Sequence, residues 1–118
     1  MRRPPTILIV QPARIVSDVL VRIVAIHAPD AVTLVSRTVQ SACERLQTAP
    51  VTAIITDDRF ADGTSIEVLA AARRHAVPAV VIADDIQREA AARIAGARAF
   101  PTKPFDIDTL LAALRFVL

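Results

Sequence analysis

The residues of this sequence that could do chemistry are two pairs of acidic side chains and one lysine. The acidic pairs are Asp57-Asp58 and Asp84-Asp85, and Lys103 is the only lysine among the 118 residues. Two carboxylates can act as the acid and base of a hydrolase, but the sequence offers no nucleophile and base at a spacing that supports such a reaction. His27 and His75 lack a nearby Cys, His or Glu at ligand spacing, so we expect no metal site built on them.

The composition excludes disordered and membrane-spanning chains. Hydrophobic residues make up 53% of the sequence and charged residues 22%, which is too apolar for an intrinsically disordered chain. No apolar run approaches the roughly 18 residues that a membrane span requires. The single cysteine, Cys43, excludes a disulfide framework and fits a reducing compartment. We therefore expect one cytoplasmic domain over residues 1–118 that makes no contact with a membrane.

The basic residues do not form a nucleic-acid-binding pattern. Thirteen of the fourteen are arginines, spread from Arg2 to Arg115, and the sequence has no Tyr or Trp for base stacking. The only glycines are Gly63 and Gly96, so glycine-rich nucleotide-binding loops are absent as well. We expect no direct binding of nucleic acid.

Five short apolar runs alternate with five patterns of helical periodicity. The predicted strands are residues 6–10, 31–36, 51–56, 78–83 and 98–102, the last an edge strand because it contains Pro101. The predicted helices are residues 13–27, 39–48, 65–75, 86–95 and 106–118. Gly96 is expected to cap the fourth helix, and Asp106 or Asp108 to lie near the start of the last. This alternation predicts an α/β domain, with a parallel sheet covered by helices on both faces.

Helical periodicity also predicts which side chains face the core. These are Ile15, Val16, Val19, Leu20, Ile23 and Val24 in the first helix, Ile66, Leu69 and Ala70 in the third, and Ile107, Leu110, Leu111, Leu114 and Val117 in the last.

The carboxyl ends of the predicted strands carry the polar side chains of interest. Ligands of parallel sheets collect beyond this edge. The residues that the sequence places there are Gln11, Pro12, Asp57, Asp58, Arg59, Ala83, Asp84, Asp85, Lys103 and Pro104. The architecture alone leaves the function open.

Two segments resemble the receiver domains of bacterial response regulators, such as the chemotaxis response regulators. The first is residues 53–57, Ala-Ile-Ile-Thr-Asp, followed at an ungapped interval by residues 66–69, Ile-Glu-Val-Leu. The second and more specific is residues 95–105, with Ala-Gly-Ala, an aromatic residue near the fifth strand and Lys-Pro-Phe at the strand's end. The resemblance covers essentially the whole chain. It implies a flavodoxin-like three-layer fold with a central five-stranded parallel sheet and five helices.

The resemblance implies roles for three residues. Asp57 matches the aspartate that accepts a phosphoryl group, and Lys103 matches the lysine that pairs with the phosphoryl oxygens. Phe100 matches the aromatic residue that changes rotamer on activation. The transfer depends on positioning and on charge neutralisation by Mg²⁺ and the lysine.

The sequence departs from the family pattern at residues that take part in this phosphoryl transfer. The family holds Mg²⁺ with two acidic residues directly after the first strand, where this sequence has Gln11 and Pro12. The hydroxyl residue that ends the fourth strand matches Ala83, which has no donor, so we expect Phe100 to act as a plug rather than a switch. Because Mg²⁺ prefers carboxylate oxygens, we expect no Mg²⁺ cofactor, or a weakly bound one.

The acidic and basic residues near Asp57 in the predicted site allow two ways to compensate for the missing metal ligands. A Mg²⁺ site could be rebuilt from Asp57 with Asp58 or Asp84. Alternatively, the guanidinium group of Arg14 or Arg59 occupies the space of the metal and pairs with Asp57. The simpler alternative is that both arginine side chains point to solvent.

Three readings of the function follow. The first is a non-enzymatic, atypical receiver domain in two-component or phosphorelay signalling, acting by protein–protein contact with Mg²⁺-dependent phosphorylation weakened or lost. The second is a working receiver phosphorylated on Asp57 by a histidine kinase. The third is a flavodoxin-like domain that binds a small molecule in the vacated pocket, lined by Gln11, Thr56, Asp57 and Asp84.

The resemblance implies a signalling protein as partner: a histidine kinase, an output domain or another regulator. In the family the usual contact face is built from the fourth helix, the fifth strand and the fifth helix. Phe116 and Leu118 add apolar side chains to the last helix, which predicts a homodimer or partner contact on this face. A fraying terminus and a boundary to a further domain are the alternatives.

Overall fold

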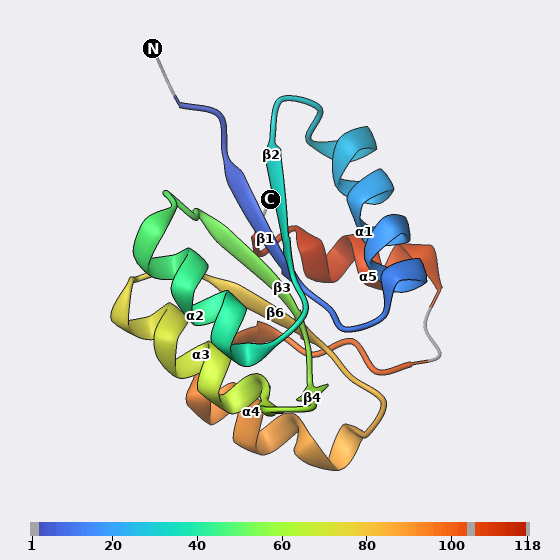
Figure 1. The fold of residues 1–118 in the computed structure, drawn as a ribbon. Coiled ribbons are helices and arrows are strands. Elements are labelled where there is room, and N and C mark those ends of the chain that lie inside the picture. The colour runs from blue at the N-terminus through green and yellow to red at the C-terminus, as the bar shows by residue number, and fades with distance from the viewer. Residues whose placement is uncertain (1–2, 104–105, 118) are drawn as a thin grey trace.

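Five parallel strands form one sheet in the order β2-β1-β3-β6-β7 (Figure 1). The structure is a computed structural model that describes residues 3–103 and 106–117. Pro104, Phe105 and Leu118, which enter the predictions above, lie outside the described residues. The strands are β1 (Thr6–Val10), β2 (Val32–Ser36), β3 (Ala53–Asp57), β6 (Ala79–Ile82) and β7 (Ala97–Ala99).

Helices cover the sheet on both faces (Figure 1). They are α1 (Arg14–His27), α2 (Val39–Thr48), α3 (Ser65–Arg74), α4 (Glu89–Ala95) and α5 (Ile107–Leu114). Helices α1 and α5 pack on one face, where Leu20 and Leu114 join a core cluster with Ile9. Helices α2, α3 and α4 pack on the other face, around Leu8 and Val68. The predicted three-layer, flavodoxin-like fold is thus confirmed.

Local sequence explains where the elements begin and end. All five residues of β1 are buried, as expected for a continuous apolar run covered on both faces. Thr64 and Glu67 form a capping box at the start of α3. Gly96 ends α4 in the left-handed conformation, with φ 118°, and Asp106 caps α5 by accepting from Thr109 N–H, both as predicted.

Several predicted boundaries were wrong. Strand β7 stops at Ala99, because Pro101 cannot donate to the ladder, and beyond it only Thr102 forms a single bridge, with Ala83. Residues 86–88 of the fourth predicted helix form the short 3₁₀ helix η1 (Ile86–Arg88), capped by Asp85. Helix α5 ends at Leu114 rather than at residue 118.

The predicted core faces were also too wide. In α1, Ile15 is 80% exposed and Val19 is 50% exposed, whereas the small polar Ser17 is buried. The buried face of α1 is centred on Ser17, Leu20 and Val24, so side chains at the margin of the apolar stripe remain in solvent. For the same reason Ala70 in α3 and Ile107 in α5 are exposed.

One small element was not predicted. Strands β4 (Arg59–Phe60) and β5 (Gly63–Thr64) form an antiparallel hairpin between β3 and α3. The carboxylate of Asp62 in its turn accepts hydrogen bonds from Val39 N–H and Gln40 N–H, at 2.9 and 3.0 Å. The hairpin therefore satisfies the open donors at the start of α2. Within residues 3–103 and 106–117, no helix combines the length and the hydropathy needed to cross a bilayer.

Candidate functional site

Asp57 is the last residue of β3 and lies at the carboxyl edge of the sheet, as predicted. Its Oδ1 accepts a hydrogen bond from Asp58 N–H at 2.9 Å and lies 3.8 Å from Lys103 Nζ. The same Nζ lies 3.7 Å from Oδ1 of Asp84, after β6. Lys103 is positioned by its backbone N–H, which donates to the carbonyl of Ala83 at 2.8 Å. The structure thus brings together Asp57, Asp84 and Lys103 from three chain segments.

Burial dominates the electrostatics of Asp57. It raises the pKa of the Asp57 carboxyl above its ordinary value of 3.8, because removing water disfavours the charged form. The Asp58 N–H and the Lys103 ammonium lower this pKa in part, and the Asp84 carboxylate raises it. The site therefore holds one partly shielded carboxyl group beside a single ammonium and the exposed carboxylate of Asp84.

The position of the expected metal ligands is occupied by an amide and a proline. The Gln11 side chain is buried, and its Oε1 already accepts a hydrogen bond from Ala13 N–H at 3.0 Å. Its Nε2, a donor that cannot ligate a cation, is buried and makes no hydrogen bond of normal geometry in the described part of the chain, although the Gln11 side chain is close enough to Asp57 to lower the pKa of that carboxyl slightly. Pro12 is exposed. Among the described residues no group of three His, Cys, Asp or Glu side chains lies close enough to hold a metal. The two positions directly after β1 therefore offer no carboxylate oxygen to Mg²⁺, and the predicted alternative of a weak site from Asp57 with Asp84 stays a prediction.

Asp58 is committed to a buried cluster. Only 3% of Asp58 is exposed. Its Oδ1 accepts from Ser65 Oγ and its Oδ2 from Arg88 Nε, each at 2.5 Å. Each Asp58 oxygen thus already accepts one hydrogen bond, which makes Asp58 a weaker ligand for the predicted rebuilt Mg²⁺ site. Ser65 and Arg88 were missed from the sequence, since Arg88 lies 30 residues from its partner and no local pattern links them.

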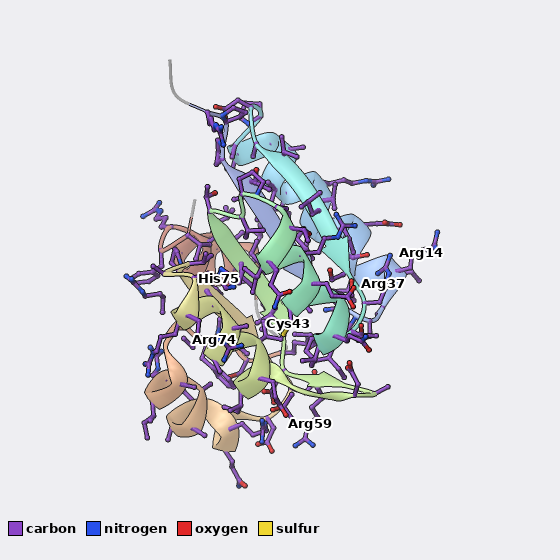
Figure 2. All side chains as sticks on the ribbon, turned by 60° about the vertical axis from the view of Figure 1, so that its left-hand side comes forward. Arg14, Arg37, Cys43, Arg59, Arg74 and His75 are labelled. Carbon is purple, nitrogen blue, oxygen red and sulfur yellow. The ribbon has the colours of Figure 1, made fainter. Side chains whose placement is uncertain are left out.

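Arg14 and Arg59 do not replace the metal. Figure 2 shows both side chains extending outward from the ribbon. Nη2 of Arg59 lies 3.9 Å from Oδ2 of Asp85, in a solvent-exposed pair. Arg14 forms no ion pair with any described residue, and Asp57 pairs with Lys103. The hypothesis that one of these guanidinium groups pairs with Asp57 is therefore contradicted, because neither forms an ion pair with Asp57 among the described residues.

Ala83 and Phe100 lie in the core behind the site. Ala83 is fully buried, and Phe100 is 5% exposed and belongs to the same core cluster as Ala83 and Ala92. No hydroxyl is present at residue 83 to reach toward Asp57. Phe100 is buried in this structure, and its role as a plug rather than a switch stays a prediction.

Two cavities differ in their relation to these residues. A cavity of about 120 Å³ is lined by Asp57, Asp58, Arg59 and Asp84. Ligand pockets usually measure about 300–1,000 Å³. Gln11 and Thr56, the other two residues of the predicted small-molecule pocket, are not among its lining residues, so that lining was wrong.

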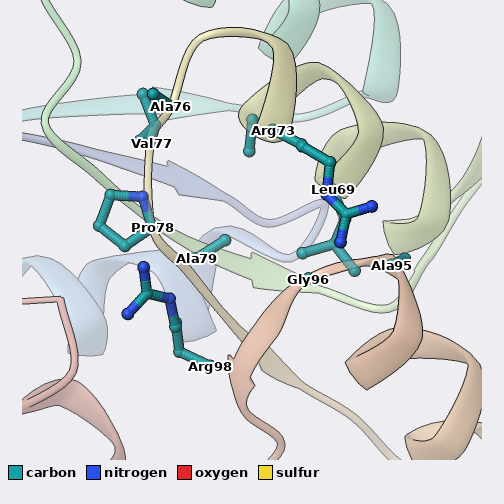
Figure 3. A pocket seen from close by; sticks show the side chains of 10 residues that line it. Leu69, Arg73, Ala76, Val77, Pro78, Ala79, Ala95, Gly96 and Arg98 are labelled. Atoms are coloured by element: carbon teal, nitrogen blue, oxygen red, sulfur yellow. The ribbon is translucent and has the colours of Figure 1, made fainter.

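The larger cavity, about 320 Å³, lies at the opposite, amino-terminal edge of the strands. Figure 3 shows it between the end of α3 and the starts of β6 and β7, flanked by Arg73 and Arg98. Arg73 Nη2 donates to the carbonyl of Ile94 at 3.2 Å, which ties α3 to the end of α4. This cavity is separate from the Asp57 site.

Comparison with solved structures identifies proteins that have the same fold. A CheY-like response regulator receiver domain from Methanospirillum hungatei JF-1 matches with a TM-score of 0.82 at 18% identity, over 94% of this chain and 90% of that chain. FixJ-N matches with a TM-score of 0.82 at 21% identity, over 99% and 94%. The response regulator TrrA from Thermotoga maritima, in complex with Mg²⁺ and BeF, matches with a TM-score of 0.84 at 14% identity, over 97% and 99%.

These proteins are similar to this chain in structure, whereas their sequence identity to it is low. No protein-family model and no curated protein matches this sequence. The chain has the fold of CheY-like receiver domains, as its sequence motifs predicted.

Proposed function

We propose that this chain is an atypical receiver domain of two-component signalling that acts by protein–protein contact. In this proposal Mg²⁺-dependent phosphorylation of Asp57 is weakened or lost, no Mg²⁺ cofactor is needed, and the chain is not an enzyme. The fold and the Asp57–Lys103 pair support the receiver reading. The residues around this pair support the interpretation that the receiver domain is atypical.

One observation supports the proposal that this receiver domain is atypical: Gln11 and Pro12 occupy the positions that the resemblance assigns to the Mg²⁺ ligands. Phosphoryl transfer relies on cations that neutralise charge on the transferring oxygens. Gln11 Oε1 is engaged by Ala13 N–H, and both Asp58 oxygens are engaged by Ser65 and Arg88. Among the described residues Lys103 is the one cation that pairs with Asp57, and one ammonium would leave most of that charge uncompensated.

Exposed apolar side chains support a protein partner. Ile86 of η1, Ile94 of α4, Ile107 of α5 and Phe116 after α5 are all more than half exposed. They lie on and beside the elements of the predicted contact face, built from α4, β7 and α5. Removing such side chains from water favours association. The partner would be a histidine kinase, an output domain, another regulator or a second copy of this chain.

A second candidate is a working receiver phosphorylated by a histidine kinase. The observation that favours it is the retained pair of Asp57 and Lys103, 3.8 Å apart at the carboxyl edge. In that reaction an Asp57 oxygen attacks phosphorus, the phosphorus–nitrogen bond to the kinase histidine breaks, and its electron pair stays on the nitrogen.

Intact mass spectrometry after incubation with Mg²⁺ and acetyl phosphate tests the proposal. We expect no adduct in the wild type. A labile phosphoryl adduct that is absent from Asp57→Asn would overturn the atypical reading and support the second candidate. Asp84→Asn is the matched control, because it removes a carboxylate beside Lys103 while leaving Asp57 in place.

A further inference from the structure

Two ion pairs cross between the segment after β3 and the segment after β6. Asp58 and Arg59 follow β3, and Asp85 and Arg88 follow β6. Asp58 pairs with Arg88 at 2.5 Å, and Arg59 pairs with Asp85 at 3.9 Å. Each segment therefore supplies one acid and one base to the other. The two pairs differ sharply in exposure, because the Asp58 side chain is 4% exposed whereas that of Arg59 is 67% exposed.

The buried pair is the stronger of the two. A carboxylate leaves water only when a counter-charge and hydrogen bonds replace its hydration. Arg88 supplies the charge and Ser65, the first residue of α3, supplies the second hydrogen bond. The hydrogen bond to Asp58 also raises the pKa of Arg88, which keeps the guanidinium charged. The exposed Arg59–Asp85 pair is screened by solvent and adds little.

Among the described residues, the Asp58–Arg88 pair is the one buried ion pair between these two segments. Ala83 has no side-chain donor, so residue 83 cannot draw the segment after β6 toward the end of β3. Arg88 makes such a connection from five residues further along. Within the same segment, Asp85 Oδ1 accepts from Gln87 N–H at 2.9 Å, and Arg88 N–H donates to the Asp85 carbonyl at 3.2 Å. η1 is thus held at both ends.

We propose that Arg88 is a constitutive latch: its pair with Asp58 holds residues 84–89 against the end of β3 without a phosphoryl group. The latch fixes the start of α4, and with it the exposed side chains of Ile86 and Ile94. A role of this latch in regulation rests on the proposed function. A contact face that Arg88 holds in place would form without phosphorylation. Partner binding through this face should then depend on Arg88.

Amide hydrogen exchange on the full chain, in buffer free of Mg²⁺ and phosphoryl donor, tests the latch. The test variant combines Asp58→Asn with Arg88→Met, so that no unpaired charge is left buried. Arg59→Gln is the matched control, because it removes the exposed pair between the same two segments. The probes are the hydrogen-bonded amides of residues 87–89, normalised to the amides of β1 in the same protein.

We expect the normalised exchange of these three amides to rise about tenfold in the double variant and less than about twofold in Arg59→Gln. Equal normalised rates in the two variants would overturn the latch. Normalisation to β1 separates loosening of this segment from global loss of stability.

A second arm separates the latch from the proposed function. The wild type is measured again after Mg²⁺ and acetyl phosphate are added. A phosphoryl adduct would contradict the proposed function, whereas the latch is judged from the unmodified protein alone. Each proposal can therefore fail without the other.

Discussion

The Lys103 ammonium lies 3.8 Å from Oδ1 of Asp57, which joins the end of β3 to the segment after β7. This distance exceeds the roughly 2.7–2.9 Å of a charge-assisted hydrogen bond. The pair is therefore an electrostatic contact rather than a close hydrogen bond. Lys103 offsets only part of the cost of burying Asp57, and the pKa of that carboxyl remains raised.

The raised pKa gives a prediction for pH dependence. Asp57 binds its proton more tightly in the folded than in the unfolded protein, so its ionisation disfavours folding. Its contribution to stability is complete below its ordinary pKa of 3.8 and is lost as the pH rises through the folded-state pKa. We expect Asp57→Asn to raise the free energy of unfolding at pH 7 by about 1 kcal/mol. Urea unfolding of both proteins between about pH 3 and pH 7 measures the difference, which should shrink toward the acid end.

Asp62 serves as a control, because its pKa is shifted in the opposite direction to that of Asp57. Hydrogen bonds from the backbone N–H groups of Gln40 and Val39 lower the pKa of Asp62. Its contribution is therefore present above its ordinary pKa of 3.8 and lost as the pH falls through the lower folded-state pKa. We expect Asp62→Asn to destabilise the protein at pH 7. If both variants shifted stability in the same direction at pH 7, the assignment of these pKa shifts would be wrong.

The hydrogen bond from Ser65 to Asp58 should contribute measurably to stability. Both side chains are buried, and the acceptor is a carboxylate. We expect Ser65→Ala to lower the free energy of unfolding by about 1.5–3 kcal/mol, the usual loss for a hydrogen bond to a charged group. Thr48→Ala is the control, because the Thr48 hydroxyl donates to a carbonyl on the exposed face of α2 and should change stability by less than about 0.5 kcal/mol. Comparable losses in chemical denaturation would contradict a special role for the Asp58 cluster.

The sequence was sufficient to predict the sheet and the meeting of Asp57 with Lys103. Continuous apolar runs such as residues 6–10 are unambiguous because both of their faces are buried. Carboxyl ends of parallel strands share one edge, so residues that follow β3 and β7 lie at the same edge, and the resemblance to receiver domains implies that Asp57 and Lys103 belong to one site there. Neither inference required knowledge of a specific side-chain contact.

The Asp58–Arg88 pair could not be predicted in the same way. The two residues are 30 positions apart, and each belongs to a short polar stretch that is typical of an exposed loop. The hairpin of β4 and β5 was equally hidden, because two-residue strands carry no periodicity. In α1, the exposure of Ile15 and Val19 depends on how the helix is rotated against the sheet, which an apolar stripe broader than the contact does not define.

Ala76 should be a site where glycine stabilises the protein. It follows α3 with φ 55°, and its neighbour Val77 donates to the carbonyl of Ala72 at 2.9 Å, the pattern of a left-handed helix end. The left-handed conformation costs an L-residue about 1–2 kcal/mol, which exceeds the roughly 0.5–1 kcal/mol of extra chain entropy that glycine loses on folding. We expect Ala76→Gly to raise the free energy of unfolding by up to about 1 kcal/mol.

The matched control makes the same substitution in regular helix. Ala70 is exposed within α3, where glycine should lower the free energy of unfolding by about 1 kcal/mol. Thermal unfolding of the two variants should therefore give Tm shifts of opposite sign. A lower Tm for both would mean that the end of α3 carries no backbone strain.

Restoring carboxylates at the metal-ligand positions should create Mg²⁺ affinity. Gln11→Asp combined with Pro12→Asp adds two carboxylates directly after β1, at the same edge of the sheet as Asp57, and Mg²⁺ favours such oxygen ligands. Without the ion, the added acidic groups repel Asp57 and should lower the Tm. Saturating Mg²⁺ should raise it again, because a ligand at 100 times its Kd stabilises the folded state by about 2.7 kcal/mol. The wild type should show no such Mg²⁺-dependent rise, and adding Asp57→Asn to the double variant should remove most of it. An equal rise in the wild type would mean that Gln11 and Pro12 do not weaken metal binding, and the atypical reading would lose the observation that carries it.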